Sequence, residues 1–263
     1  MISNTIHFSC TQCGNCCHDL RLPLAVDEAI DWLRDGGDVQ VLCEAIPWPE
    51  EPPQANQVAQ YKRGRSFAAQ SGELPVRVAV TLVASFQGPC PHLQADMRCD
   101  AYAKRPRVCR IYPAEVNPFF KLVPGNKACP PEAWNTGTTI LIAGDTVADP
   151  EVAGYIAQSR DADRQDVGTK EALCANLAIF TTALANEGFV IHSRQREITL
   201  DALLAARKSV PSGHAPAGTA TPWHFVTNRT ATRAVLGEIG ALAMAAADTM
   251  PDATEYLALL PGD

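Results

Sequence analysis

The stretch FSCTQCGNCCH at residues 8–18 constrains this chain more than any other, because it places Cys10, Cys13, Cys16 and Cys17 within eight residues. Two-residue gaps let consecutive thiolates turn toward a common centre, and Gly14 supplies the backbone freedom that a tight metal-binding loop needs. Adjacent side chains in an irregular segment tend to diverge, so we expect Cys16 and Cys17 to point in different directions, one into a site and one away. The loop therefore needs partners from elsewhere in the chain.

Four further cysteines follow after a long interval and supply those partners. They are Cys90 in GPCPHL, Cys99 in MRCDAY, Cys109 in RVCRIYP and Cys129 in KACPPE. Eight clustered thiols suffice for two mononuclear four-thiolate sites, or for one iron–sulfur cluster with thiols to spare, and the spacing does not choose the pairing. His18 and His92 each lie close to a clustered cysteine and are alternative ligands. Cys43 and Cys174 lie in apolar segments, and we expect both to be buried packing residues.

Three ordered motifs, FxCxxCGxCC, CPxL and CxxYxxRPxxCRxYP, resemble the CxxCxxCC cysteine-cluster family, whose members are described as zinc- or iron-chelating domain proteins. The matching residues are Phe8, Cys10, Cys13, Gly14, Cys16, Cys17, Cys90, Pro91, Leu93, Cys99, Tyr102, Arg105, Pro106, Cys109, Arg110, Tyr112 and Pro113. The resemblance covers roughly the first half of the chain. It implies a metal-chelating, mostly bacterial and archaeal, cytoplasmic module, and a similar cysteine cluster accompanies flagellin lysine methylases. It does not imply a reaction.

Ten cysteines in 263 residues is a high content, and the compartment decides how to interpret it. The start, MISNTIHFSC, has neither a basic segment nor an apolar run, so we expect no secretory signal and a reducing cytoplasm. Closely spaced cysteines in such a compartment bind metal more often than they form disulfides, whereas a removed signal peptide would favour a disulfide framework. No apolar run reaches the ~20 residues of a bilayer span, so we expect no membrane insertion.

The net charge of −7 argues against nucleic-acid binding, which depends on accumulated Lys and Arg. The charge is uneven, because residues 98–127 carry seven basic side chains against two acidic ones. Positive surroundings favour thiolates and offset the charge of a four-thiolate site. Arg105, Arg110 and Tyr102 are therefore candidates for the surroundings of the bound cofactor. A scaffold role within RPxxCRxYP, anion binding and a solvated basic face are the alternatives for these side chains.

The pattern of apolar residues predicts an α+β protein in two parts. Residues 1–134 are expected to form a small metal-stapled cysteine-cluster domain with few short strands and helices, and residues 135–263 a mainly α-helical region packed on it. A helix is expected within residues 20–37, followed by strands over 39–46 and 74–86. A strand pair is expected near 119–123, and Cys109 on an extended segment. In the second part, helices are expected over 150–162, 168–187, 199–208 and 229–248.

Three functions remain open from the sequence. The first is an iron–sulfur protein, [4Fe–4S] being favoured, with a redox or cluster-supported role. The second is a structural Zn²⁺ module that presents a surface to a partner, and the third is metal storage or trafficking. Motifs of common hydrolases, kinases and dehydrogenases are absent from the sequence, and whether the protein is an enzyme stays open. Metal ions are the expected partners, together with a protein partner bound through the helical C-terminal region.

Overall fold

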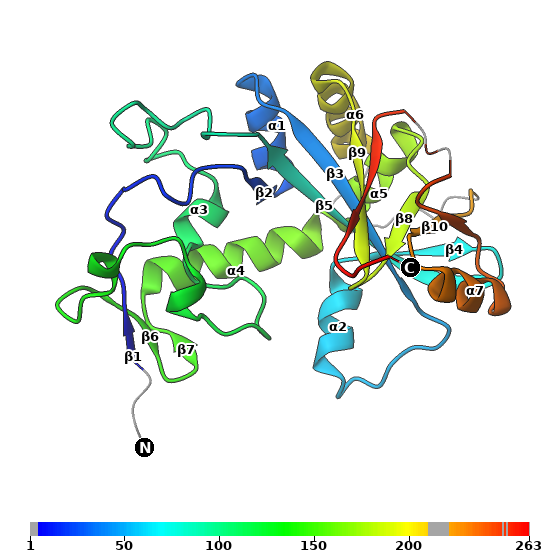
Figure 1. The fold of residues 1–263 in the computed structure, drawn as a ribbon, viewed down its shortest axis with the longest axis horizontal. Coiled ribbons are helices and arrows are strands. Elements are labelled where there is room, and N and C mark those ends of the chain that lie inside the picture. Colours follow the sequence, from blue (N-terminus) through cyan, green and yellow to red (C-terminus); the bar gives the residue numbers. More distant parts are fainter. Residues whose placement is uncertain (1–4, 210–220, 249, 251, 263) are drawn as a thin grey trace. The chain divides into compact units, whose positions relative to one another are not determined.

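The computed structural model describes residues 5–209, 221–248, 250 and 252–262, and the chain forms two compact units (Figure 1). Unit 1 combines Met1–Leu24 with Ser85–Ala162, and unit 2 combines Ala25–Ala84 with Asp163–Asp263. The parts expected from the sequence, residues 1–134 and 135–263, are each one continuous segment. Each unit of the structure is instead built from two separate segments. Composition does not reveal a chain that leaves one core, builds part of another and returns.

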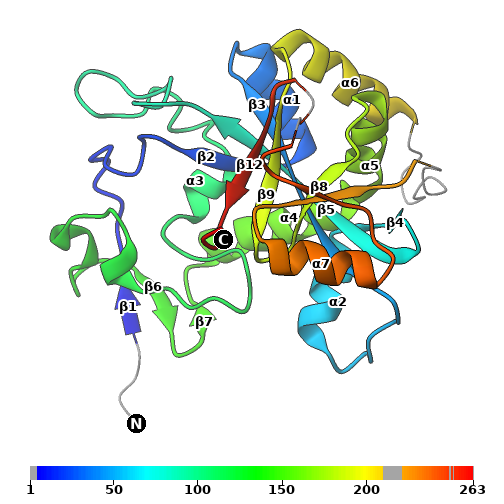
Figure 2. The same ribbon diagram turned by 45° about the vertical axis from the view of Figure 1, so that its right-hand side comes forward.

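Unit 2 is organised around a mixed β-sheet, which Figure 2 shows from a second direction. Its main order is β11 (Ala243–Ala245), β10 (His224–Thr227), β8 (Thr181–Leu184), β3 (Val39–Pro47) and β5 (Leu74–Ser85). β4 (Phe67–Ser71) pairs with β5, β9 (Gly188–Ser193) pairs with β3, and β12 (Thr254–Ala258) pairs with β9. The contacts β3·β8, β8·β10 and β10·β11 are parallel, and the other pairings are antiparallel.

The strands expected over 39–46 and 74–86 are confirmed as β3 and β5, which pair antiparallel from Val39↔Ala84 to Pro47↔Val76. Val76, Val78 and Val80 of β5 are buried at alternate positions, as the period of a strand requires. β-Branched side chains suit this pleated, buried surface, which explains why the sequence pattern was decisive here.

Helices flank the sheet, and α1 (Val26–Arg34) confirms the helix expected within 20–37. The Asp166 carboxylate accepts a hydrogen bond from the Val26 N–H at 2.9 Å, and the chain leaves the helix at Gly36, whose φ of +93° favours glycine. α1 packs with α6 (Arg196–Ser209), and α6 packs with α5 (Val167–Asn176).

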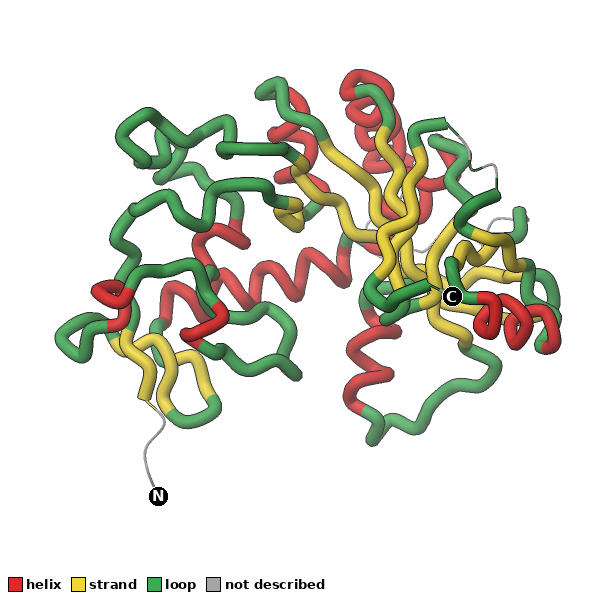
Figure 3. Tube along the Cα trace, viewed as in Figure 1, coloured by secondary structure: helices red, strands yellow, loops and turns green. Residues whose placement is uncertain are grey.

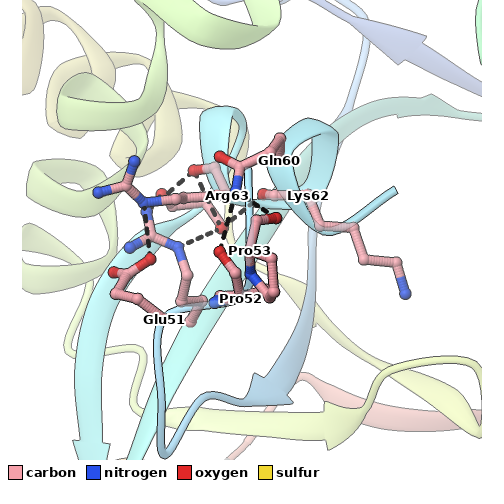
Figure 4. Close-up of polar contacts among 8 residues, drawn as sticks. Glu51, Pro52, Pro53, Gln60, Lys62 and Arg63 are labelled. Carbon is pink, nitrogen blue, oxygen red and sulfur yellow. Dashed lines mark hydrogen bonds and ion pairs between the residues drawn. The ribbon is translucent and has the colours of Figure 1, made fainter. Parts of the chain in front are cut away.

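The short helix α2 (Gln57–Gly64) is tied to the proline turn before it (Figure 4). The Gln60 amide donates to the carbonyl oxygens of Pro52 and Pro53 at 3.3 and 3.4 Å, and Arg63 pairs with Glu51 at 3.2 Å. These contacts fix a polar segment that has no buried side chains in its helix.

The expectation of a mainly helical C-terminal part is not met, although the mixture of helices and sheets agrees with an α+β protein. The helix expected over 168–187 ends at Asn176, and β8 follows it. The helix expected over 229–248 divides into α7 (Thr230–Glu238) and β11. The Ala-rich sequence of β11 favours a helix, but parallel pairing with β10 overrides that local preference.

Unit 1 has little regular structure, and Figure 3 shows much of it as loop. Its strands are β1 (Thr5–His7), β6 (Ile140–Ala143) and β7 (Thr146–Val147), which form a small antiparallel sheet, and β2 (Arg21–Leu24). Its short helices are α3 (Arg107–Ile111), η1 (Pro124–Asn126) and η2 (Pro131–Trp134). The strand pair expected near 119–123 is absent from this described segment, where the structure has turns and loops.

A small hydrophobic core supports unit 1. Ile111 of α3, Ala114, Leu141 of β6 and Ile156 of α4 (Pro150–Gln165) are its buried members. α4 begins where the Asp149 carboxylate accepts the N–H groups of Glu151 and Val152 at 2.9 and 3.1 Å, so the helix start expected at residue 150 is confirmed. None of the helices within the described ranges is long and apolar enough to cross a membrane.

Candidate metal centre

All eight clustered cysteines belong to unit 1, and its loops carry most of them. Cys109 lies in α3 rather than on the extended segment expected from the sequence, because the residues after Pro106 close one helical turn. Gly14, inside the first cysteine run, has a φ of +69°. A Cβ at this position would lie 2.8 Å from the Met97 carbonyl oxygen, so only glycine fits the close approach between the two loops.

Cys10, Cys13 and Cys16 of the first loop lie near Cys129, and we call these four cysteines the N-terminal group. The thiolates of Cys10 and Cys13 act electrostatically on Cys129, and those of Cys129 and Cys10 act on Cys16. Backbone contacts bring the two segments together, since the Ser9 N–H donates to the Ala133 carbonyl at 2.9 Å. The Asn15 amide donates to the Ala128 carbonyl at 3.4 Å.

The other four cysteines also lie close together, and we call Cys17, Cys90, Cys99 and Cys109 the central group. The thiolates of Cys17, Cys90 and Cys99 all act on Cys109, and Cys17 acts on Cys90 and Cys99. The Cys90 N–H donates to the Cys17 carbonyl at 2.8 Å. A β-bridge joins Leu93 to Cys99.

The two groups meet at Cys16 and Cys17, whose sulfur atoms are 4.0 Å apart. Cys16 otherwise interacts with thiols of the N-terminal group, and Cys17 interacts with thiols of the central group. Sequence spacing left the pairing of the eight cysteines open, whereas the fold divides them into two groups of four. The sorting depends on the path of residues 85–130, which no local pattern reveals.

Burial disfavours the thiolate form of Cys109 and Cys16, one in each group. Burial raises the pKa of Cys109 to about 12, and the neighbouring thiolates of Cys17 and Cys90 add to the shift. Burial also raises the pKa of Cys16 well above its usual range, with Cys17 as a further cause. A bound cation reverses this balance, because it stabilises several thiolates at once and displaces their protons.

Nearby backbone N–H groups donate hydrogen bonds to individual sulfurs and oppose the rise in the pKa of those thiols. Burial raises the pKa of Cys90 and of Cys99, while the backbone N–H groups of His92 and Ala101 donate to these sulfurs and lower it. Such N–H···S contacts stabilise the thiolate form that binds metal. The His92 ring itself contacts the Asp100 carboxylate at 3.0 Å.

The predicted residues around the site lie beside the central group. The guanidinium of Arg105 stacks over the ring of Tyr102 at 3.7 Å and acts favourably on the thiolates of Cys109 and Cys99. Arg110 instead holds the loop, because it donates to the carbonyls of Arg105, at 3.0 Å, and Ala103, and to the Tyr155 hydroxyl at 2.8 Å. Arg110 thus makes the contacts of a scaffold residue.

Tyr112, which the sequence places in the third cysteine motif, is a neighbour of the N-terminal group. Its hydroxyl accepts the Ala128 N–H at 2.9 Å and donates to the sulfur of Cys129, and burial raises its pKa to about 12. Lys127 lies 5.5 Å from the Tyr112 ring and pairs with Glu115 at 2.6 Å. The signal available from the sequence was the place of Tyr112 in the third motif, CxxYxxRPxxCRxYP.

The donor set fits a soft metal, but the geometry of a finished site is not preformed. In the described ranges no group of three or more His, Cys, Asp or Glu side chains is already arranged to hold an ion. The thiols are neighbours, and closing a four-thiolate site requires their side chains to turn inward as the metal binds.

Cys43 and Cys174 belong to unit 2, whereas both cysteine groups belong to unit 1. Both are buried, with 0% and 1% of their surface exposed, as expected for packing residues. Their thiols are hydrogen-bonded to each other, between β3 and α5, a contact that the sequence did not indicate.

Comparison with known families gives a match over one segment, which is less than half of the chain. Residues 9–130 match the family model CxxCxxCC, described as "Putative zinc- or iron-chelating domain". The match confirms the resemblance expected from the three cysteine motifs and supports a metal-binding cysteine cluster. No curated protein and no solved structure was found to match the chain.

Proposed function

From the membership of residues 9–130 in the CxxCxxCC family, we propose that the protein carries an iron–sulfur cluster on cysteine thiolates and uses it in a redox or cluster-supported role. The N-terminal group is the proposed holder, with Cys10, Cys13, Cys16 and Cys129 as the four ligands. The observation that carries the proposal is the meeting of this C-x2-C-x2-C run with a distant fourth cysteine. Ferredoxin cysteine runs share that spacing and, like Cys129, end on Cys-Pro.

The surroundings of the N-terminal group suit a negatively charged cluster. Tyr112 donates a hydrogen bond to Cys129, and the ammonium group of Lys127 acts favourably on the same sulfur. Hydrogen bonds to ligand sulfurs and nearby positive charge set the potential of such a centre. When bound, an iron–sulfur cluster supplies one-electron transfer, and these side chains hold and tune the ligands.

A structural zinc site is the second candidate, and the central group favours it. The N–H···S contacts to Cys90 and Cys99, with the bridge between Leu93 and Cys99, resemble the fixed turns of a closed four-thiolate site. Zn²⁺ held by Cys17, Cys90, Cys99 and Cys109 contributes folding free energy and no redox chemistry. Metal storage or trafficking is the third reading, supported by the number of thiols.

The experiment is anaerobic purification followed by absorption spectroscopy and analysis of iron, sulfide and zinc. We expect a brown protein that absorbs near ~400 nm and contains iron with labile sulfide. Colourless protein with two zinc ions would reject the iron–sulfur proposal in favour of the zinc alternative. Cys13→Ser is expected to lower the iron content, and Cys43→Ala, which changes a buried thiol outside the groups, should leave it unchanged. A protein partner for the C-terminal half and a cytoplasmic location stay predictions.

A further inference from the structure

We propose that the two cysteine groups are unequal, the central group being a fixed structural centre and the N-terminal group an exchangeable one that admits chelators, oxidants or an acceptor thiol. This inference rests on the proposed metal binding. It concerns which group releases its metal first, and it holds for iron or zinc.

The central group is held by backbone structure on every side. Its first ligand, Cys17, is joined to Cys90 through the 2.8 Å hydrogen bond between main-chain atoms. This bond and the one from the Asp19 N–H to the Gly88 carbonyl, also 2.8 Å, form the antiparallel bridge His18↔Pro89. Cys99 is part of a bridge with Leu93. These backbone contacts limit how far the segments that carry Cys17, Cys90 and Cys99 can move apart without opening hydrogen bonds.

The fourth ligand of the central group is anchored in the hydrophobic core. Cys109 lies in α3, two residues before Ile111, whose exposed fraction is 1%. Ile111 packs in one cluster with Leu141 and Ile156. Moving Cys109 would disturb this packing, so the core resists the departure of its sulfur.

The N-terminal group has weaker support. Cys10 is exposed, whereas the other clustered cysteines are partly covered. The backbone between Cys10 and Cys16 belongs to no strand or helix. It is joined to the Cys129 segment by the Ser9–Ala133 backbone bond and the Phe8–Trp134 ring contact near one end. Within the cysteine run itself the link is the exposed Asn15–Ala128 contact, whose 3.4 Å length makes it a weak hydrogen bond.

These differences predict the route of metal release. An attacking ligand must reach one sulfur while that sulfur's side chain turns away, and Cys10 meets both conditions. Cys109 meets neither condition as well, because it is partly covered and its backbone is held in α3. Cys10 is therefore the expected entry point, and the N-terminal group empties before the central group.

The test follows metal release from the full, metal-loaded chain into excess EDTA, in parallel with iodoacetamide labelling read by mass spectrometry. We expect two phases that differ roughly tenfold or more in rate, because the two groups differ in local opening. Cys10, Cys13, Cys16 and Cys129 should be labelled during the fast phase, while Cys17, Cys90, Cys99 and Cys109 stay protected until the slow one.

Cysteine-to-serine variants test which cysteine group gives rise to each phase of metal release. Cys10→Ser should remove the fast phase and leave the slow phase, whereas Cys99→Ser should remove the slow phase. The labelling order in the unmodified chain decides the matter where a variant fails to fold. One common rate for all eight cysteines, or earlier labelling of the central group, would overturn the inequality. A chain that binds no metal at all would instead refute the proposed function.

Discussion

Unit 2 and unit 1 obtain their order from different sources. Unit 2 buries alternating apolar side chains of long strands, such as Val78 and Leu82 of β5, each 0% exposed. Unit 1 has a core cluster of four buried residues, and its loops and the short helix α3 together carry eight thiols. Apolar burial stabilises a sheet without any ligand, whereas a loop-rich segment with a small core would gain order from the metal binding proposed above. The difference teaches that unit 1, unlike unit 2, has little apolar burial of its own, so the proposed metal binding by its cysteines would matter most there.

Metal removal should produce the largest difference in stability between the two units. A structural four-thiolate site contributes on the order of 10 kcal/mol of folding free energy, so excess EDTA should unfold the loops of unit 1 and leave β3 and β5 ordered. Hydrogen exchange read by mass spectrometry measures both regions in the same sample. Equal loss of protection in residues 39–47 and 90–130 would remove the distinction between the units.

Creating a cavity in unit 2 should lower the free energy of unfolding without removing metal, the opposite of what is expected for EDTA. Leu82→Ala deletes a fully buried side chain, and we expect a loss of about 3 kcal/mol in unfolding free energy with unchanged metal content. Val58→Ala, at a side chain that is 45% exposed, is the matched control and should cost about 0.5 kcal/mol or less. Metal loss in proportion to the lost stability would show that the units depend on each other.

Acid should weaken unit 2 through a buried histidine. His192 is 1% exposed, and burial lowers its pKa from 6.5 to about 4. The unfolded chain therefore binds the proton first, so this contribution is present above pH 6.5 and is lost as the pH falls toward 4. The full effect is about 3 kcal/mol. Urea unfolding at pH 7 and pH 4.5 should show a smaller difference for His192→Gln than for the parent chain, and an identical difference would contradict the assignment.

The smallest effect is expected at a cysteine outside both groups. Cys174→Ala removes a buried sulfur and its hydrogen bond to Cys43, which should cost about 1 kcal/mol. Metal content should stay constant, as measured by elemental analysis. A loss of metal comparable with that of Cys13→Ser would show that unit 2 also takes part in binding.

Local sequence patterns predicted those elements that their own residues specify. The β-branched run of β5 and the Asp149 start of α4 were both found as expected. Helix predictions failed at β8 and β11, because pairing with neighbouring strands outweighs the weak helical preference of a short apolar segment. Cys109 was misplaced because one helical turn after Pro106 leaves little periodic signal.

The sequence by itself determined the chemistry of the site, since eight thiols, their spacing and the family motifs follow from residue identity alone. The tertiary structure decided which cysteines meet, because Cys129 reaches Cys10 and Cys109 reaches Cys17 across intervals that only the folded chain closes. It also decided that residues 25–84 belong to unit 2. Long-range contacts depend on the packing of the whole chain, and packing is not encoded in any single motif.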